Sequence, residues 1–183
     1  AGEPVIARYT PPFMPTFLRR NEVLVPVRRV PATADVAEAA ARANRLQGEL
    51  SAKLQAALGA GGPIAAIAVC KLEAPAIAAR LSVDGWQVRR VGTRVRNPAS
   101  GRGDAWEQAG LEQFAQRLRA GEPAESLTVA ALVGDAGGVT RLRWMRPIMT
   151  GALCVTCHGP TESQSPELKA ALRRDYPQDA AVG

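Results

Sequence analysis

Apolar residues follow a helical period in the first regular part of the chain. Between residues 36 and 58 they recur every three or four positions, in a segment rich in good helix formers. Thr33 or Asp35 is the expected N-cap, because both side chains can accept a main-chain hydrogen bond. The glycines at 59, 61 and 62 are expected to end this helix.

A second, mostly apolar helix is predicted over residues 63–73. Pro63 stands at its start, where a proline has no hydrogen bond to lose. Pro75 has no N–H to donate to Lys71, so it should kink this helix or begin a new one that runs to about Leu81.

The pattern then alternates between polar and apolar residues. Residues 86–91 and 93–96 predict two strands, and the turn-forming residues of 97–103 predict a loop. Asp104 is the expected N-cap of a further helix that ends at Gly121. The predicted buried stripe of this helix consists of Leu111, Phe114 and Leu118.

A hairpin and a closing helix are predicted in the last third of the chain. Residues 127–133 and 139–148 have strand character, and the glycine-rich segment 134–138 between them predicts a tight turn. Residues 166–174 predict the last helix. Helices followed by mostly antiparallel strands indicate an α+β fold.

The domain organisation follows from where this pattern begins. Residues 1–32 are rich in proline and predict an N-terminal arm without much regular structure. No internal repeat or linker divides the rest, so residues 33–183 are expected to form a single domain. The 183-residue chain is 46% hydrophobic and 22% charged, which is typical of a globular protein.

Charge excludes some functions and leaves others open. Lys and Arg total 23 against 17 Asp and Glu, for a formal net charge of +6. Aromatic residues make up only 4%, too few for the basic and aromatic pattern of a nucleic-acid interface. The longest apolar run, residues 63–70, is too short to span a membrane. A positive surface suits an acidic partner.

The five residues Cys154-Val155-Thr156-Cys157-His158 form a C-x-x-C-H motif, and His158 is the single histidine of the chain. Two thiols at this spacing can add to the two vinyl groups of one haem, and the histidine behind them can bind the iron. Covalently attached haem c is therefore the expected cofactor.

Three other interpretations remain open at this point. A redox-active C-x-x-C would sit at the start of a helix after an apolar strand. A Cys₃His zinc site could use Cys70, Cys154, Cys157 and His158. The motif cysteines could also form a structural disulfide, which would leave the histidine unexplained.

The second axial ligand cannot be a histidine, because the chain has only one. The candidates are Cys70, the methionines Met14, Met145 and Met149, water, or a vacant site. Cys70 could simply be a small buried residue, as free cysteines often are. A free thiol is a liability in an oxidising compartment, and sequestration as an iron ligand would account for Cys70.

With these motifs, the chain resembles a family of single-haem c-type proteins with a PAS-like fold. The family includes stand-alone cytochromes and extracytoplasmic sensor regions. The resemblance covers about residues 33–180. The stretches that carry it are 62–70, 74–78, 85–90, 96–98, 104–107, 143–148, 154–159 and 176–179.

The resemblance implies a five-stranded antiparallel sheet flanked by helices. It also implies that Cys70 is the distal iron ligand. The chain departs from the usual family pattern at residues 91–94, where Val-Gly-Thr-Arg replaces Thr-Ser-Leu-Lys.

The expected function is electron transfer, or sensing of redox state or of a small diatomic ligand. Arg94, Arg96 and Arg146 are expected to pair with the haem propionates, because guanidinium groups bind carboxylates in bidentate geometry. A redox partner protein is expected, and the site of haem attachment predicts a periplasmic or otherwise extracytoplasmic location. Turnover of peroxide or nitric oxide by a haem enzyme is the alternative, together with the non-haem interpretations above. A further alternative is an interaction module with a purely structural haem.

Overall fold

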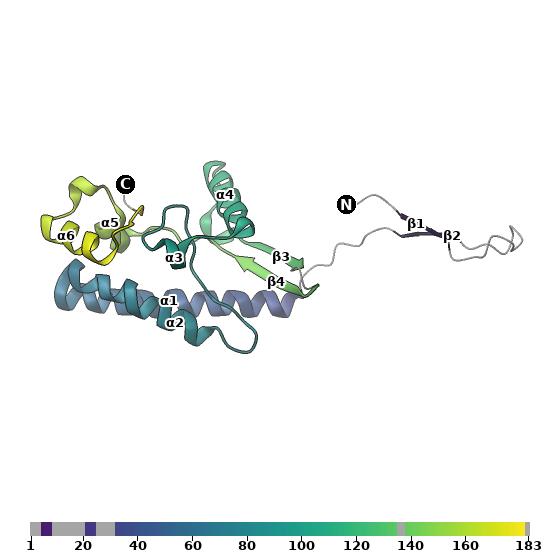
Figure 1. Cartoon of the computed structure of the whole chain (residues 1–183), viewed down its shortest axis with the longest axis horizontal. Coiled ribbons are helices and arrows are strands. Elements are labelled where there is room, and N and C mark those ends of the chain that lie inside the picture. The colour runs from purple at the N-terminus through teal and green to yellow at the C-terminus, as the bar shows by residue number, and fades with distance from the viewer. Residues whose placement is uncertain (1–4, 9–20, 25–31, 135–137, 182–183) are drawn as a thin grey trace, which may run out of the picture.

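The computed structural model describes residues 5–8, 21–24, 32–134 and 138–181 (Figure 1). Its longest element is helix α1, Thr33–Ala68. Gly61 and Gly62 break the helical conformation, with Gly62 at a φ of 66°, so α1 consists of two helices that meet at a kink. This confirms the predicted helix end at the glycines, and Pro63 begins the second helix, where it needs no donor. The predicted caps at Thr33 and Asp35 are wrong: Ala32 is the N-cap and no side chain caps the helix.

A π-helical turn follows α1 and leads directly into the next helix. The turn η2 is Val69–Glu73, and the helix α2 is Ala74–Leu81. The break is the one predicted from Pro75, whose missing N–H prevents a regular α-helical ladder at this point. Packing of α2 against α1 forms one apolar core, which consists of Leu46, Ile77 and Leu81.

The segment between α2 and α4 contains no strand ladder. Residues 86–91 and 93–96, predicted as strands, form none; Gly92 between them makes one isolated parallel bridge with Arg102. Strand propensity depends on a neighbouring strand to pair with, and this segment has none. Its backbone is held instead by scattered contacts, as where Val88 N donates to Ser82 Oγ at 2.9 Å and Gly92 N donates to Gly101 O at 3.1 Å. The short helix α3, Pro98–Gly101, is capped by Asn97.

Helix α4, Ala105–Arg119, is the predicted third helix. Asp104 caps it, and Glu107 completes a capping box by binding back to the Asp104 N–H. Phe114 is buried at 2% exposure, as the stripe predicted. A 3₁₀ turn, η3 (Ala124–Ser126), leads from α4 to the hairpin.

Two pairs of strands are present among the described residues. Strands β3 (Val129–Gly134) and β4 (Thr140–Met145) form the predicted antiparallel hairpin, with Val129 opposite Met145. Strands β1 (Val5–Arg8) and β2 (Asn21–Leu24) also pair, within the arm where no regular element was predicted.

The C-terminal helices pack beside α1. Helix α5 is Ala152–His158, η4 is a 3₁₀ turn at Thr161–Ser163, and α6 is Pro166–Asp175. Figure 1 shows α5 and α6 along one end of α1, while β4 meets α1 farther along. The core at the first of these contacts consists of Ile67, Leu168, Ala171, Leu172 and Tyr176, with Cys157 packed against it.

The chain therefore has an α+β fold that is dominated by helices. The five-stranded sheet implied by the family resemblance is not seen among the described residues, which form two separate two-stranded sheets. No helix in this part of the chain is both long and apolar enough to cross a membrane.

Candidate functional site

The C-x-x-C-H motif lies on helix α5. Cys154 precedes Cys157 by three positions and His158 by four, so the three side chains share one face of the helix. Gly159 ends the helix in a confined position, where a Cβ atom would lie 2.5 Å from the carbonyl oxygen of Val155. All three cysteines of the chain are free thiols. Helix α5 therefore presents two thiols and an imidazole together.

One ring nitrogen of His158 is held by the main chain. Its Nδ1 lies 3.2 Å from the carbonyl oxygen of Ala181. A carbonyl oxygen only accepts, so this contact favours the tautomer with the proton on Nδ1 and a lone pair on Nε2. Burial, and secondarily the charge of Arg96, lower the pKa of His158 below its usual value, so the imidazole is neutral at pH 7. This is the state in which a histidine binds a metal ion.

His158 also lines a large cavity. The cavity has a volume of about 1030 Å³ and is bounded by α1, residues 84–94, α4 and residues 141–150, with His158 and Ala181 completing its wall. This volume lies at the upper end of the range for cofactor and ligand sites. Seven arginines line the cavity: Arg42, Arg89, Arg90, Arg94, Arg141, Arg143 and Arg146.

Cys70 lies in the π-helical turn η2, near the motif cysteines. Burial raises the pKa of the Cys70 thiol, and Cys154 raises it further, while Arg90 and Arg96 act in the opposite direction. Cys70 in turn raises the pKa of Cys157, where burial is again the largest cause. The fold thus brings Cys70 near the two motif cysteines, although they are 84 or more positions farther along the chain. Cys70 does not line the cavity.

Arg96 lies behind His158, away from the cavity lining. Its Nη2 donates to the carbonyl oxygen of Cys157 at 2.7 Å and lies 3.4 Å from His158 Nδ1. Its Nη1 forms an ion pair with Asp179 at 2.8 Å, and its guanidinium lies over the ring of Tyr176, 5.7 Å from the centroid. The structure therefore places Arg96 against the histidine and the C-terminal segment, whereas Arg94 and Arg146 line the cavity.

The methionine candidates differ in their surroundings. Met145 and Met149 both line the cavity. The sulfur of Met145 packs closely against Gly110 of α4, since a Cβ there would lie 2.9 Å from it. Met149 is 57% exposed. Met14 lies outside the described residues.

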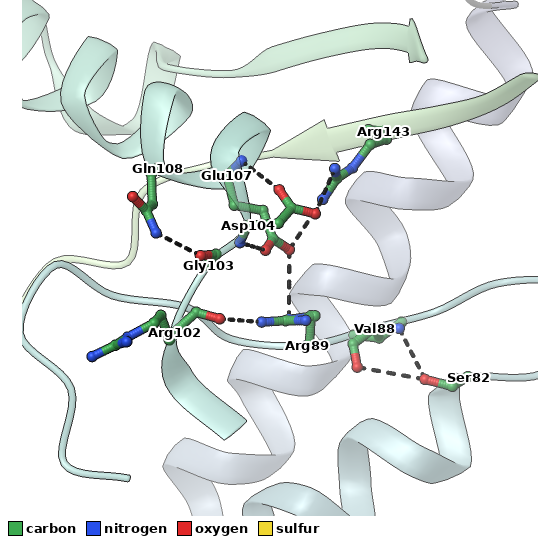
Figure 2. A network of polar contacts seen from close by, with 9 residues as sticks. All are labelled: Ser82, Val88, Arg89, Arg102, Gly103, Asp104, Glu107, Gln108 and Arg143. Carbon is green, nitrogen blue, oxygen red and sulfur yellow. Dashed lines mark hydrogen bonds and ion pairs between the residues drawn. The ribbon is translucent and has the colours of Figure 1, made fainter. Parts of the chain in front are cut away.

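A second polar network lies in the wall formed by α4, β4 and residues 86–91 (Figure 2). The buried carboxylate of Glu107 accepts from the Asp104 N–H at 2.8 Å and pairs with Arg89 at 3.5 Å and Arg143 at 3.3 Å. Arg143 also pairs with Asp104 at 2.7 Å and stacks over Trp106. We call this set the Glu107 network. It ties three segments of the cavity wall together.

Residues 27–183 match the sequence family described as Tll0287-like. The chain belongs to the Tll0287-like family.

The fold of this family member resembles a solved structure, described as that of the cyanobacterial heme-protein Tll0287. The match has a TM-score of 0.61 at 20% sequence identity, and covers 84% of this chain and 88% of the solved one. At this sequence identity the comparison shows a similar fold and nothing further. Comparison with curated proteins gives no significant match.

The rival interpretations of the motif in this Tll0287-like chain lack support in the structure. The described residues hold no group of three or more His, Cys, Asp or Glu side chains placed to bind a metal ion, so the Cys₃His zinc site is not formed. No disulfide joins the motif cysteines. A redox-active C-x-x-C would follow an apolar strand, whereas residues 146–151 directly before α5 form no strand.

Three residues of the site were not found from the sequence. Asp179, Ala181 and Gln164 all contact the motif or its neighbours, and Gln164 donates to the Cys157 carbonyl oxygen at 3.1 Å. Asp179 falls in a stretch that carries the family resemblance, but nothing in its surroundings indicated a role. Contacts between segments far apart in sequence leave no local pattern.

Proposed function

We propose that this chain is a c-type protein with one covalently attached haem. Cys154 and Cys157 would form the two thioether bonds, and His158 would bind the iron through Nε2. The observation that carries the proposal is the setting of His158: burial lowers its pKa, its Nδ1 lies 3.2 Å from the Ala181 carbonyl oxygen, and it lines a cavity of cofactor size. The match to a family that includes a haem protein supports the same conclusion.

Cys70 is proposed as the second axial ligand. Its support is the convergence of its thiol with Cys154 and Cys157, which are free and lie on the face of α5 that carries His158. Burial keeps this thiol protonated at neutral pH in the absence of metal, so ligation would release a proton. A thiolate gives electron density to iron and favours the ferric state, which predicts a low reduction potential.

The proposed role is electron transfer, or sensing of redox state or of a small diatomic ligand, outside the cytoplasm. The haem, when bound, supplies one-electron redox chemistry. The chain itself supplies the attachment, the axial ligands and a wall rich in arginines. Arg94 and Arg146 line the cavity and remain the proposed partners of the propionates. The net charge of +6 suits an acidic redox partner.

The first experiment tests covalent attachment. The full chain is produced in a host with a c-type haem maturation system, and the denatured protein is examined by haem staining and absorption spectroscopy. Wild type should keep its haem after denaturation, and the double variant Cys154→Ala/Cys157→Ala should not. A wild-type protein without a Soret band contradicts the proposal.

The second experiment tests the distal ligand. Cys70→Ser should keep the covalent haem, because the attachment cysteines are intact, but it should lose the ferric low-spin spectrum of thiolate ligation. Its reduced form should also bind carbon monoxide faster than wild type. An unchanged spectrum would remove Cys70 from the ligand set, and Met145→Leu and Met149→Leu would then be the variants to compare.

A further inference from the structure

The C-terminal segment forms a set of contacts behind His158 that the attachment motif does not account for. Asp179 joins two of them. One carboxylate oxygen forms an ion pair with Arg96 at 2.8 Å, and the other accepts from the Ala181 N–H at 2.8 Å. Both partners of the ion pair are well buried, with side chains 10% and 12% exposed. Asp179 thus holds an arginine with one oxygen and a peptide group with the other.

These contacts decide which group meets His158 Nδ1. Two groups lie near that nitrogen: the Ala181 carbonyl oxygen at 3.2 Å, which can only accept, and Arg96 Nη2 at 3.4 Å, which can only donate. The carbonyl favours the tautomer with the proton on Nδ1. The guanidinium favours the tautomer with the proton on Nε2, which has no lone pair left for a metal ion.

Asp179 acts on both competitors in the same sense. By binding the Ala181 N–H it holds that peptide group beside the imidazole, and by pairing with Arg96 Nη1 it draws the guanidinium toward itself. The Cys157 carbonyl oxygen takes a hydrogen bond from Arg96 Nη2 and removes part of its donor capacity. Two further contacts fix the segment: the Ala180 N–H donates to Val95 O at 3.0 Å, and Tyr176 lies in the core under Arg96.

We propose that Asp179 is a positioning residue that, through Arg96 and Ala181, selects the Nδ1-protonated tautomer of His158 and so leaves Nε2 available to iron. We call Arg96, Asp179 and Ala181 the His158 clamp. The purpose of the clamp, which is to leave Nε2 available to iron, rests on the proposed function. The tautomer of His158 is a property of the chain and can be measured without haem. Loss of Asp179 releases the carbonyl and frees Arg96 to donate to Nδ1.

The test uses the fact that the chain has a single histidine. The full chain is made without haem attachment and with ¹⁵N-labelled histidine, so that ring-nitrogen NMR reports on His158 alone. In wild type the protonated nitrogen should be Nδ1. In Asp179→Asn the population should move toward Nε2 protonation by about tenfold or more, a change of about 1.4 kcal/mol between the tautomers.

The matched control is Asp175→Asn. Asp175 lies at the end of α6, forms an ion pair with Lys71 at 2.7 Å and is 17% exposed, but it does not contact His158. It should leave the tautomer unchanged. Arg96→Lys keeps a cation beside Asp179 and should retain most of the Nδ1 tautomer. This conservative variant keeps the proposal testable if Asp179→Asn fails to fold. Equal tautomer populations in wild type and Asp179→Asn, or Nε2 protonation in wild type, would overturn the proposal.

A measurement on the haem-loaded protein separates this proposal from the proposed function. Asp179→Asn should keep its covalent haem, because Cys154 and Cys157 are untouched, but exogenous imidazole should displace His158 at least tenfold faster than in wild type. A wild-type chain without covalent haem refutes the proposed function and leaves the NMR test decisive for the clamp. Covalent haem with equal displacement rates in both proteins refutes the clamp alone.

Discussion

Two networks centred on arginine and carboxylate side chains hold the cavity, and they differ in where their hydrogen bonds end. In the Glu107 network, charged side chains meet one another across α4, β4 and residues 86–91 (Figure 2). In both networks an arginine and a carboxylate also bind the main chain, but only the His158 clamp ends on an imidazole. The first network joins walls, whereas the second fixes the state of a ligand. Changes in the first should therefore alter mainly stability, and changes in the second mainly chemistry.

The largest expected effect separates these two tasks. Glu107→Ala removes a carboxylate whose side chain is 8% exposed and leaves Arg89 and Arg143 without one of their partners. The two arginines are 42% and 27% exposed, so water partly screens these ion pairs, but the hydrogen bond to the Asp104 N–H is lost as well. The free energy of unfolding in urea should therefore fall by about 1.5–3 kcal/mol. The His158 tautomer in the remaining folded protein should not change.

The control for Glu107 is the exposed pair of Arg117 and Glu122, at 2.6 Å. Glu122→Ala should leave the urea midpoint nearly unchanged, because water screens such a pair. If the two glutamate variants lose equal stability, the Glu107 network does not join the walls of the cavity.

A smaller effect is expected at the end of α5. In Gly159→Ala the new methyl group would meet the Val155 carbonyl oxygen at 2.5 Å, so the last turn that carries His158 must shift. Overpacking of this kind costs about 1–3 kcal/mol, and thermal unfolding should show it. The matched variant is Gly151→Ala at the other end of the same helix, where no atom lies within 4 Å of the new methyl group. Equal melting temperatures for the two variants would contradict the close contact at Gly159.

Beside each network a glutamine donates to a main-chain carbonyl, which allows a direct comparison. Gln164 is 5% exposed and donates to Cys157 O at 3.1 Å, whereas the exposed Gln108 donates to Gly103 O at 2.7 Å. Gln164→Ala should lower the free energy of unfolding by about 1–2 kcal/mol, and Gln108→Ala by a few tenths. A larger loss for Gln108→Ala in urea titrations would reverse the order of the two sites.

The smallest effect is a pH dependence within the Glu107 network. Hydrogen bonding to the Glu107 N–H, followed by the Arg143 contact, holds the pKa of Asp104 below its usual value. The folded state therefore binds fewer protons at this group, so its stabilising effect is present above about pH 4 and is lost as the pH falls toward the lowered pKa. Asp104→Asn should cost a few tenths of a kcal/mol at pH 7, since asparagine still caps the helix.

The same variant should show a weaker loss of stability between pH 5 and pH 3, measured by urea unfolding. Asp35 offers a control of the same residue type in the first turn of α1. If Asp35→Asn weakens the loss of stability between pH 5 and pH 3 as much as Asp104→Asn does, the capping box does not cause that pH dependence.

The sequence predicted those features that depend on neighbouring residues. Pro75 ends a helical ladder by lacking a donor, Asp104 caps the next turn, and the spacing of the motif cysteines predicts a shared face. Each of these signals acts within a few residues. The hairpin of β3 and β4 belongs to the same group, because its two strands are joined by a short turn.

The features that were missed depend on contacts between distant residues. The alternating pattern of residues 86–96 has strand character, but no partner strand lies beside it. His158 and Ala181 are 23 positions apart, and Arg96 and His158 are 62 apart, so the clamp had no local signal.

The π-helical turn η2 makes the chain between Cys70 and α2 sensitive to length. The Ala74 N–H bonds to Val69 O, five residues back, so this turn holds one residue more than an α-helical turn. Deleting one residue between Cys70 and Pro75 would restore the regular period and rotate the preceding helix by about 100° against α2. Either Cys70 would turn away from the motif cysteines or Ile77 would leave its core. Point substitutions here should be tolerated far better than any insertion or deletion.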